Sequence, residues 1–178
     1  MTCIAAIAQN GTVYMGGDSA GVSDRHYLAI HKAPKVFQNG PYLIGYTSSF
    51  RMGQLLQYSE LPQPNDDDLT KFMVTTFVDR VRDIMKTGGV LKAENQVEEL
   101  GNFLVGVEGR LFEHDDDFGI HESEYGYNAV GSGISCALAS MYSTVGGEPK
   151  TRILVALQSA QQFTTSVREP FHIYEGLK

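Results

Sequence analysis

Short turn signals placed between pairs of apolar runs limit the possible folds most strongly. They are Asn10-Gly11, Asn39-Gly40 and Glu108-Gly109. A two-residue turn of this kind needs positive φ at both positions, and it joins neighbouring antiparallel strands. We therefore predict three β-hairpins, pairing residues 3–8 with 12–15, 36–37 with 42–46, and 103–107 with 110–112.

Outside the hairpins, apolar residues recur at the spacing of amphipathic helices. The segment 69–84 is the clearest, with charged residues on its other face and a stop near Gly88-Gly89. The further expected elements are a helix over 50–56, a loop over 90–101, strand within 118–127, a helix opening at Gly131-Ser132-Gly133, a helix after Pro149, and a last strand at 171–174.

The order of these elements is strands, two helices, strands, two helices and a final strand. A doubly wound sheet would instead alternate strand and helix along the chain. We therefore predict an α+β fold of two antiparallel sheets, each covered by helices on one side. A chain of 178 residues can bury about two thirds of its unfolded surface, so we expect one domain over 1–178, with Met1 removed.

The charge and composition of the chain exclude some classes of binding partner. Fourteen basic against 21 acidic residues leave a net charge of −7, and no basic cluster offers a nucleic-acid footprint. No apolar run approaches the roughly 20 residues that span a bilayer, so no membrane partner is expected. Cys3 and Cys136 suit a reduced compartment, and no basic region precedes the first apolar run. We expect a cytoplasmic protein.

The first residues favour a terminal nucleophile. A small residue at position 2 permits removal of Met1, after which Thr2 would carry both a nucleophilic hydroxyl and a basic α-amine. The first hairpin should return Asp18 toward Thr2. Lys35, at the start of the next strand, would lower the pKa of the Thr2 hydroxyl, and Asp18 would keep the lysine charged. Lys32 competes with Lys35 for this role.

Ser132 is a further candidate because Gly131 and Gly133 flank it at a helix start. Glycines allow close backbone approach, and free N–H groups there favour an oxyanion or hold a terminal amine. An ordinary N-cap role for Ser132 is the alternative.

Other reactive residues receive structural interpretations. Cys3 is a rival nucleophile, but as the neighbour of Thr2 in a strand it should point the other way. Cys136 is expected in the core, on an Ala-rich helix face. Asp66-Asp67-Asp68 is expected to cap a helix, and residues 114–117 to form a solvated hairpin loop. No metal or organic cofactor is expected.

Taken together, Thr2-Cys3-Ile4-Ala5, Gly17-Asp18, Lys35-Val36 and Val130-Gly131-Ser132-Gly133 resemble the proteasome β-subunit family. HslV-like bacterial peptidases are the most similar branch. These proteins are N-terminal nucleophile hydrolases. The order and approximate spacing of the motifs match from residue 2 to about residue 165.

The resemblance implies a four-layer αββα sandwich. Thr2 would be nucleophile and base, Asp18 and Lys35 the charged pair beneath it, and Ser132 a partner of the terminal amine or its water. The backbone N–H near Ser48 would supply the oxyanion hole, although the family prefers glycine there. The family's aspartate near the fourth helix is missing from 161–166, where Ser166 loosely matches the serine of that motif.

The resemblance also implies an assembly of stacked homo-oligomeric rings, usually fed unfolded polypeptide by an ATP-dependent unfoldase. We therefore hypothesise a proteasome-like threonine-type endopeptidase that acts through Thr2 in a self-compartmentalised oligomer. Two alternatives stay open. One is a ring-forming scaffold that has lost activity, and the other is an amidase of the same fold acting on a small substrate.

Overall fold

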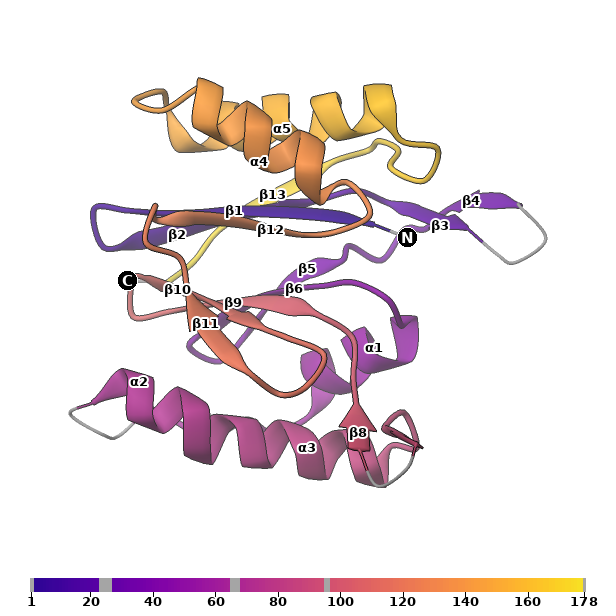
Figure 1. Cartoon of the computed structure of the whole chain (residues 1–178), viewed down its shortest axis with the longest axis vertical. Helices are drawn as coiled ribbons and strands as arrows, with labels where there is room; N and C mark the ends of the chain where they lie inside the picture. Colours follow the sequence, from indigo (N-terminus) through magenta and orange to yellow (C-terminus); the bar gives the residue numbers. More distant parts are fainter. Residues whose placement is uncertain (1, 23–26, 65–67, 95–96, 178) are drawn as a thin grey trace.

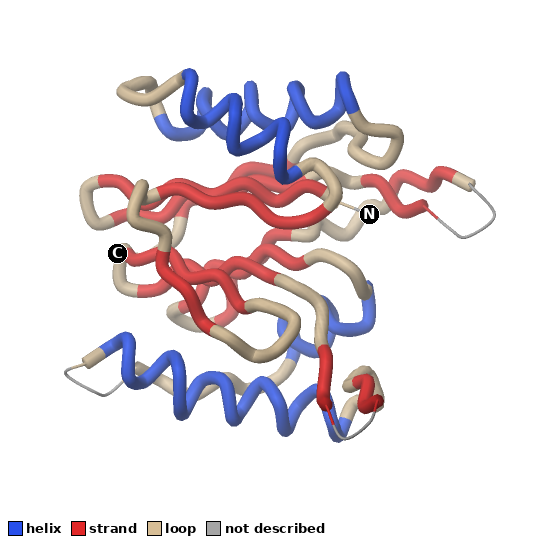
Figure 2. The backbone as a smooth tube through the Cα atoms, viewed as in Figure 1, coloured by secondary structure: helices blue, strands red, loops and turns tan. Residues whose placement is uncertain are grey.

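Two β-sheets lie face to face between two layers of helices (Figure 1). This computed structural model describes residues 2–22, 27–64, 68–94 and 97–177. The expected removal of Met1, and capping by Asp66 and Asp67, concern positions outside the described residues. Figure 2 shows the four layers, with helices outside and strands inside, and they confirm the predicted α+β sandwich of antiparallel sheets.

The first sheet has the strand order β12-β1-β2-β13, with every neighbour antiparallel. Its strands are β1 (Cys3–Gln9), β2 (Thr12–Gly17), β12 (Tyr127–Gly131) and β13 (His172–Glu175). Asn10 and Gly11 have φ of 52° and 72°, as the predicted two-residue turn requires. Helices α4 (Ile134–Ser143) and α5 (Pro149–Phe163) cover the outer face.

The second sheet has the order β11-β10-β9-β6-β5 and contains the other two predicted hairpins. In the β5–β6 hairpin the turn lies one residue later than predicted, at Gly40-Pro41, because Asn39 pairs with Tyr42 and only Gly40 has positive φ, at 55°. Its strands are β5 (Val36–Asn39), β6 (Tyr42–Tyr46), β9 (Phe103–Val107), β10 (Arg110–His114) and β11 (Ile120–Glu122). Helices α1 (Phe50–Tyr58), α2 (Leu69–Phe72) and α3 (Val78–Thr87) cover its outer face, with a π-helical turn (Met73–Phe77) between the last two. Asp68 caps α2 by accepting from the Lys71 backbone N–H.

Two short ribbons project from the sandwich. One pairs β3 (Ala20–Val22) with β4 (Leu28–Ile30), and the sequence analysis did not predict it. The other pairs β7 (Lys92–Glu94) with β8 (Val97–Glu99), so the expected loop over 90–101 was wrong there. Its polar composition lacks the apolar alternation that reveals a half-buried strand. The strand expected within 118–127 is shorter than predicted, because a turn precedes Tyr127.

Strand β1 is buried on both faces. Ile4 and Ala6 pack in the core between the sheets, whereas Cys3, Ala5 and Ile7 pack beneath α4 and α5. A strand covered on both sides reads as a continuous apolar run rather than an alternating one. Thr2, which precedes this strand, is itself buried, with 4% of its surface exposed. Among the described residues, no helix is long and apolar enough to cross a membrane.

His114 departs from the expectation of a solvated loop at 114–117. Strand β10 extends to this residue, and its side chain is fully buried. The ring stacks on Phe103, with 4.3 Å between ring centroids, and neither ring nitrogen has a hydrogen-bond partner among the described residues. Burial lowers the pKa of His114 to about 4. Asp115 and Asp117 instead stabilise the turn by accepting from the Asn102 side-chain amide and the Gly119 backbone N–H.

This buried imidazole should make the fold acid-sensitive. The unfolded chain titrates His114 near pH 6.5 and the folded chain near pH 4, so the unfolded state binds more protons between these values. The free energy of unfolding should therefore fall by about 2–3 kcal/mol through this residue between pH 7 and pH 4.5. Urea unfolding of wild type and His114→Phe at both pH values isolates the effect, because the substitution removes the titration. Parallel pH dependence in the two proteins would contradict it.

Candidate active site

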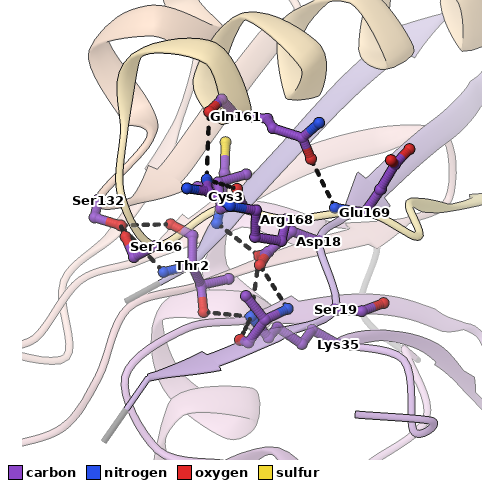
Figure 3. A network of polar contacts seen from close by, with 12 residues as sticks. Thr2, Cys3, Asp18, Ser19, Lys35, Ser132, Gln161, Ser166, Arg168 and Glu169 are labelled. Atoms are coloured by element: carbon purple, nitrogen blue, oxygen red, sulfur yellow. Dashed lines mark hydrogen bonds and ion pairs between the residues drawn. The ribbon is translucent and has the colours of Figure 1, made fainter. Parts of the chain in front are cut away.

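The Lys35 ammonium group lies directly beside the hydroxyl of Thr2 (Figure 3). Its Nζ donates to Thr2 Oγ1 at 2.9 Å, to Asp18 Oδ1 at 3.0 Å and to the Ala20 carbonyl oxygen at 2.5 Å. An ammonium group has three N–H donors, so these three acceptors use all of them. The geometry therefore aims a fixed positive charge at the Thr2 oxygen.

The β1–β2 hairpin positions Asp18. Register places Gly17 opposite Ile4, and a Cβ at Gly17 would lie 2.7 Å from the Ile4 side chain. Asp18 is the next residue in the chain. Its Oδ1 accepts from the Cys3 N–H at 3.0 Å, and its Oδ2 accepts from the Ala20 N–H at 2.9 Å. The carboxylate is therefore held from both sides before it meets Lys35.

The Lys35–Asp18 ion pair is removed from water, with side-chain exposures of 1% and 0%. Burial lowers the pKa of Lys35, and the charge of Asp18 opposes that shift. Lys32, the competing lysine of the sequence analysis, is exposed. Of the two lysines, the structure brings Lys35 into the pair.

The second half of the site lies at the end of β12. The Thr2 backbone N–H donates to Ser132 Oγ at 3.2 Å, and Ser132 Oγ donates to the Thr2 carbonyl oxygen at 3.2 Å. Gly131 has φ of 97°, and a Cβ there would collide with the Thr2 carbonyl oxygen. Gly133 N–H donates to the same oxygen at 3.3 Å, and a Cβ at Gly133 would lie 2.7 Å from the Cys3 Cβ. Both glycines therefore permit close approach of the chain around Thr2.

Ser166 joins this half of the site, although its sequence signal was weak. Its Oγ lies 2.9 Å from Ser132 Oγ, and the residue is buried. Ser166 follows α5 in an irregular segment, so neither periodicity nor a turn motif could place it. The family motif supplied only a loose match.

A cavity of about 150 Å³ opens at Thr2. Its lining residues are Thr2, Gly21, Val22, Lys35, Tyr46, Thr47, Ser48, Ser49 and Phe50. Ser48 adopts φ of 66°, a left-handed conformation that favours glycine, and its side chain lies 3.2 Å from Thr47 Oγ1. The serine therefore occupies a backbone conformation that favours glycine, and it adds a hydroxymethyl group at the cavity wall.

The two cysteines differ from each other in environment. Cys3 is fully buried in the core beneath α4 and α5, and burial raises the pKa of its thiol to about 12. A thiol protonated at neutral pH is a poor nucleophile, so Cys3 has a packing role. Cys136 is half-buried at the edge of the same core, rather than inside it as the sequence suggested.

The fold is that of the proteasome-type N-terminal nucleophile hydrolases. BPH from Thiobacillus denitrificans, solved in complex with epoxomicin, is similar over 99% of this chain and 100% of its own, with TM-score 0.81 and 15% identity. Eukaryotic HslV from Trypanosoma brucei aligns over 98% of both chains, with TM-score 0.70 and 17% identity. Anbu, an ancestral β-subunit from Yersinia bercovieri, aligns over 99% of this chain and 81% of its own, with TM-score 0.69 and 13% identity. Neither a protein-family model nor a curated protein sequence matches the chain.

The buried pair should show strong energetic coupling. Asp18→Asn leaves the Lys35 charge buried without its counter-ion and should lower the free energy of unfolding by about 3–5 kcal/mol. Adding Lys35→Met should recover part of that loss, giving a coupling energy of at least about 2 kcal/mol in a double-mutant cycle measured by urea unfolding.

An exposed pair provides the matched control. Lys150 Nζ lies 2.9 Å from Glu175 Oε2, with side-chain exposures of 48% and 44%. Its coupling energy should be much smaller than that of the buried pair, because solvent screens exposed charges. Additive effects at Asp18 and Lys35, within about 0.5 kcal/mol, would contradict the proposed electrostatic linkage.

Proposed function

We propose that this protein is a threonine-type peptidase of the N-terminal nucleophile class, with Thr2 as nucleophile. The observation that carries the proposal is the 2.9 Å contact between Lys35 Nζ and Thr2 Oγ1, backed by the buried carboxylate of Asp18. A positive charge at this distance stabilises the alkoxide form of a hydroxyl. The likeness to proteasome-type structures supports the same reading at the level of the fold.

The chemistry requires a free α-amine at Thr2, so removal of Met1 is part of the proposal. The amine takes the proton from Oγ1 as this oxygen attacks the carbonyl carbon of the substrate. The tetrahedral intermediate collapses when the protonated amine gives its proton to the leaving nitrogen, which forms an ester on Thr2. Water, deprotonated by the amine, then attacks the ester, releases the acid and restores the hydroxyl.

The remaining residues receive supporting roles. Asp18 keeps Lys35 charged, and Ser132 holds the α-amine through the 3.2 Å contact that its Oγ makes with Thr2 N. The Ser48 backbone N–H would stabilise the oxyanion from the wall of the cavity, since a donor aimed at developing charge is a large catalytic term. Gly131 and Gly133 allow the backbone to close around Thr2.

The proposal extends to substrate and assembly. We propose unfolded polypeptides as substrates and stacked homo-oligomeric rings as the working form, with an ATP-dependent unfoldase as partner and the cytoplasm as location. The similarity to HslV and to Anbu supports the ring assembly. Because BPH was solved in complex with epoxomicin, we propose epoxyketone peptides as probes of Thr2 here.

Substitutions at Thr2 and Lys35 test the proposal on a fluorogenic peptide and an unfolded protein. Thr2→Ala should abolish hydrolysis, and Lys35→Met should reduce kcat by about 100-fold or more, because it removes preorganised stabilisation of the alkoxide. Lys32→Met is the matched control, since Lys32 is exposed and should leave kcat within about twofold. Equal activity of wild type and Lys35→Met would contradict the assigned role.

The same assay separates the alternatives. A small-molecule amidase would hydrolyse small amides through Thr2 as an isolated subunit, and it would leave unfolded protein intact. The small volume of the cavity, about 150 Å³, is the observation that favours this second candidate. A scaffold would form the oligomer and hydrolyse neither substrate.

A further inference from the structure

One nitrogen of the Arg168 side chain contacts several backbone carbonyl groups at and beyond the end of α5. Arg168 Nη1 donates to the backbone carbonyl oxygens of Gln161 at 3.4 Å, Thr164 at 2.9 Å and Val167 at 2.6 Å. Figure 3 shows the arginine side chain lying between the end of this helix and the residues around Thr2. The segment that follows the helix therefore forms a loop around the guanidinium group, which holds it in place through these hydrogen bonds.

This position suits a positive charge. The last carbonyl groups of a helix lack intrahelical partners and form the negative end of the helix dipole. Helix α5 ends at Phe163 and has no basic residue in its last turn. Arg168, from beyond the helix, supplies the charge and donates to one carbonyl group of the last turn, that of Gln161, as well as to those of Thr164 and Val167 beyond it.

Ser166 lies inside the loop that Arg168 closes, between the carbonyl groups of Thr164 and Val167. Its Oγ lies 2.9 Å from Ser132 Oγ, which lies 3.2 Å from Thr2 N. The guanidinium group is therefore linked to Ser166 through the backbone of residues 164–167, and contacts of Ser166 with Ser132 and of Ser132 with Thr2 continue to the nitrogen that would act as the base.

The backbone around Arg168 also reaches the other half of the site. The Arg168 carbonyl oxygen accepts from the Ser19 N–H at 3.0 Å, and Ser19 Oγ donates to the Pro170 carbonyl oxygen at 2.6 Å. Ser19 follows Asp18 directly in the chain. Gln161 Oε1 accepts from the Glu169 N–H at 2.8 Å and holds the same segment against α5.

We propose that Arg168 is a positioning residue for the α-amine of Thr2, acting through the 164–167 loop, Ser166 and Ser132. This inference rests on the proposed function, because the amine matters only if Thr2 is the nucleophile. Without the guanidinium group, the carbonyl oxygens of Gln161, Thr164 and Val167 lose their shared donor. The loop then loses the conformation that places Ser166 against Ser132.

The test is the second-order rate of Thr2 modification by an epoxyketone peptide, measured on the full-length protein. Arg168→Met should slow modification at least about tenfold, since small displacements of reacting groups produce large rate losses. Arg168→Lys, which keeps a cation with several donors, should recover to within about threefold of wild type. In a Ser166→Ala background, adding Arg168→Met should change the rate by less than about twofold, because the two residues act in series.

Arg80→Met is the control, since Arg80 is an exposed arginine on α3 that also donates to a backbone carbonyl, that of Glu60. It should leave the rate unchanged within about twofold. If Arg168→Met does not fold, as judged by circular dichroism, Arg168→Gln replaces it under the same criteria.

A folded Arg168→Met or Arg168→Gln that reacts at the wild-type rate overturns the inference. Equal slowing by Arg168→Met and Arg168→Lys also overturns it, because the charge would then be irrelevant. The inference is also overturned if the Arg168 and Ser166 substitutions slow modification by independent factors that multiply in the double variant. Wild type that takes no label overturns the proposed function and this inference together, whereas failure of the Arg168 criteria in a labelled wild type overturns this inference alone.

Discussion

The buried ion pair of Lys35 and Asp18 is the interaction on which the site depends. Two charges withdrawn from water are stable only when every donor and acceptor finds a partner. Asp18 meets this condition through the backbone N–H groups of Cys3 and Ala20, and Lys35 through three oxygens. Because one of those oxygens is Thr2 Oγ1, the same arrangement that stabilises the pair also fixes the hydroxyl and its electrostatic environment.

Much of the fold could be predicted because its signals are local. Asn10-Gly11 and Glu108-Gly109 form the turns of two hairpins as predicted, and the turn of the third lies one residue after the start of the predicted Asn39-Gly40. The amphipathic spacing of 69–84 predicts the long helical segment. The ribbon of β7 and β8 was missed because its composition is polar. The burial of His114 was missed because tertiary packing against Phe103, not the neighbouring aspartates, determines its environment.

The two halves of the candidate site differ in how well they could be predicted from the sequence. The β1–β2 hairpin turn alone predicts that Asp18 returns toward Thr2. By contrast, Ser132 and Ser166 approach Thr2 through contacts between distant parts of the chain, and sequence periodicity does not predict such contacts. The family resemblance pointed to Ser132, but Ser166 matched only loosely and Arg168 belongs to an irregular segment that carried no signal.

The most direct test of the central claim is the intact mass of the purified protein after incubation with an epoxyketone peptide. The account predicts a chain that has lost the mass of Met1 and carries one adduct, with no adduct on Thr2→Ala. This result would establish a free and activated threonine at the terminus. A wild-type chain that retains Met1 and takes no adduct would contradict the account, because Thr2 nitrogen would then be a peptide nitrogen that cannot act as a base.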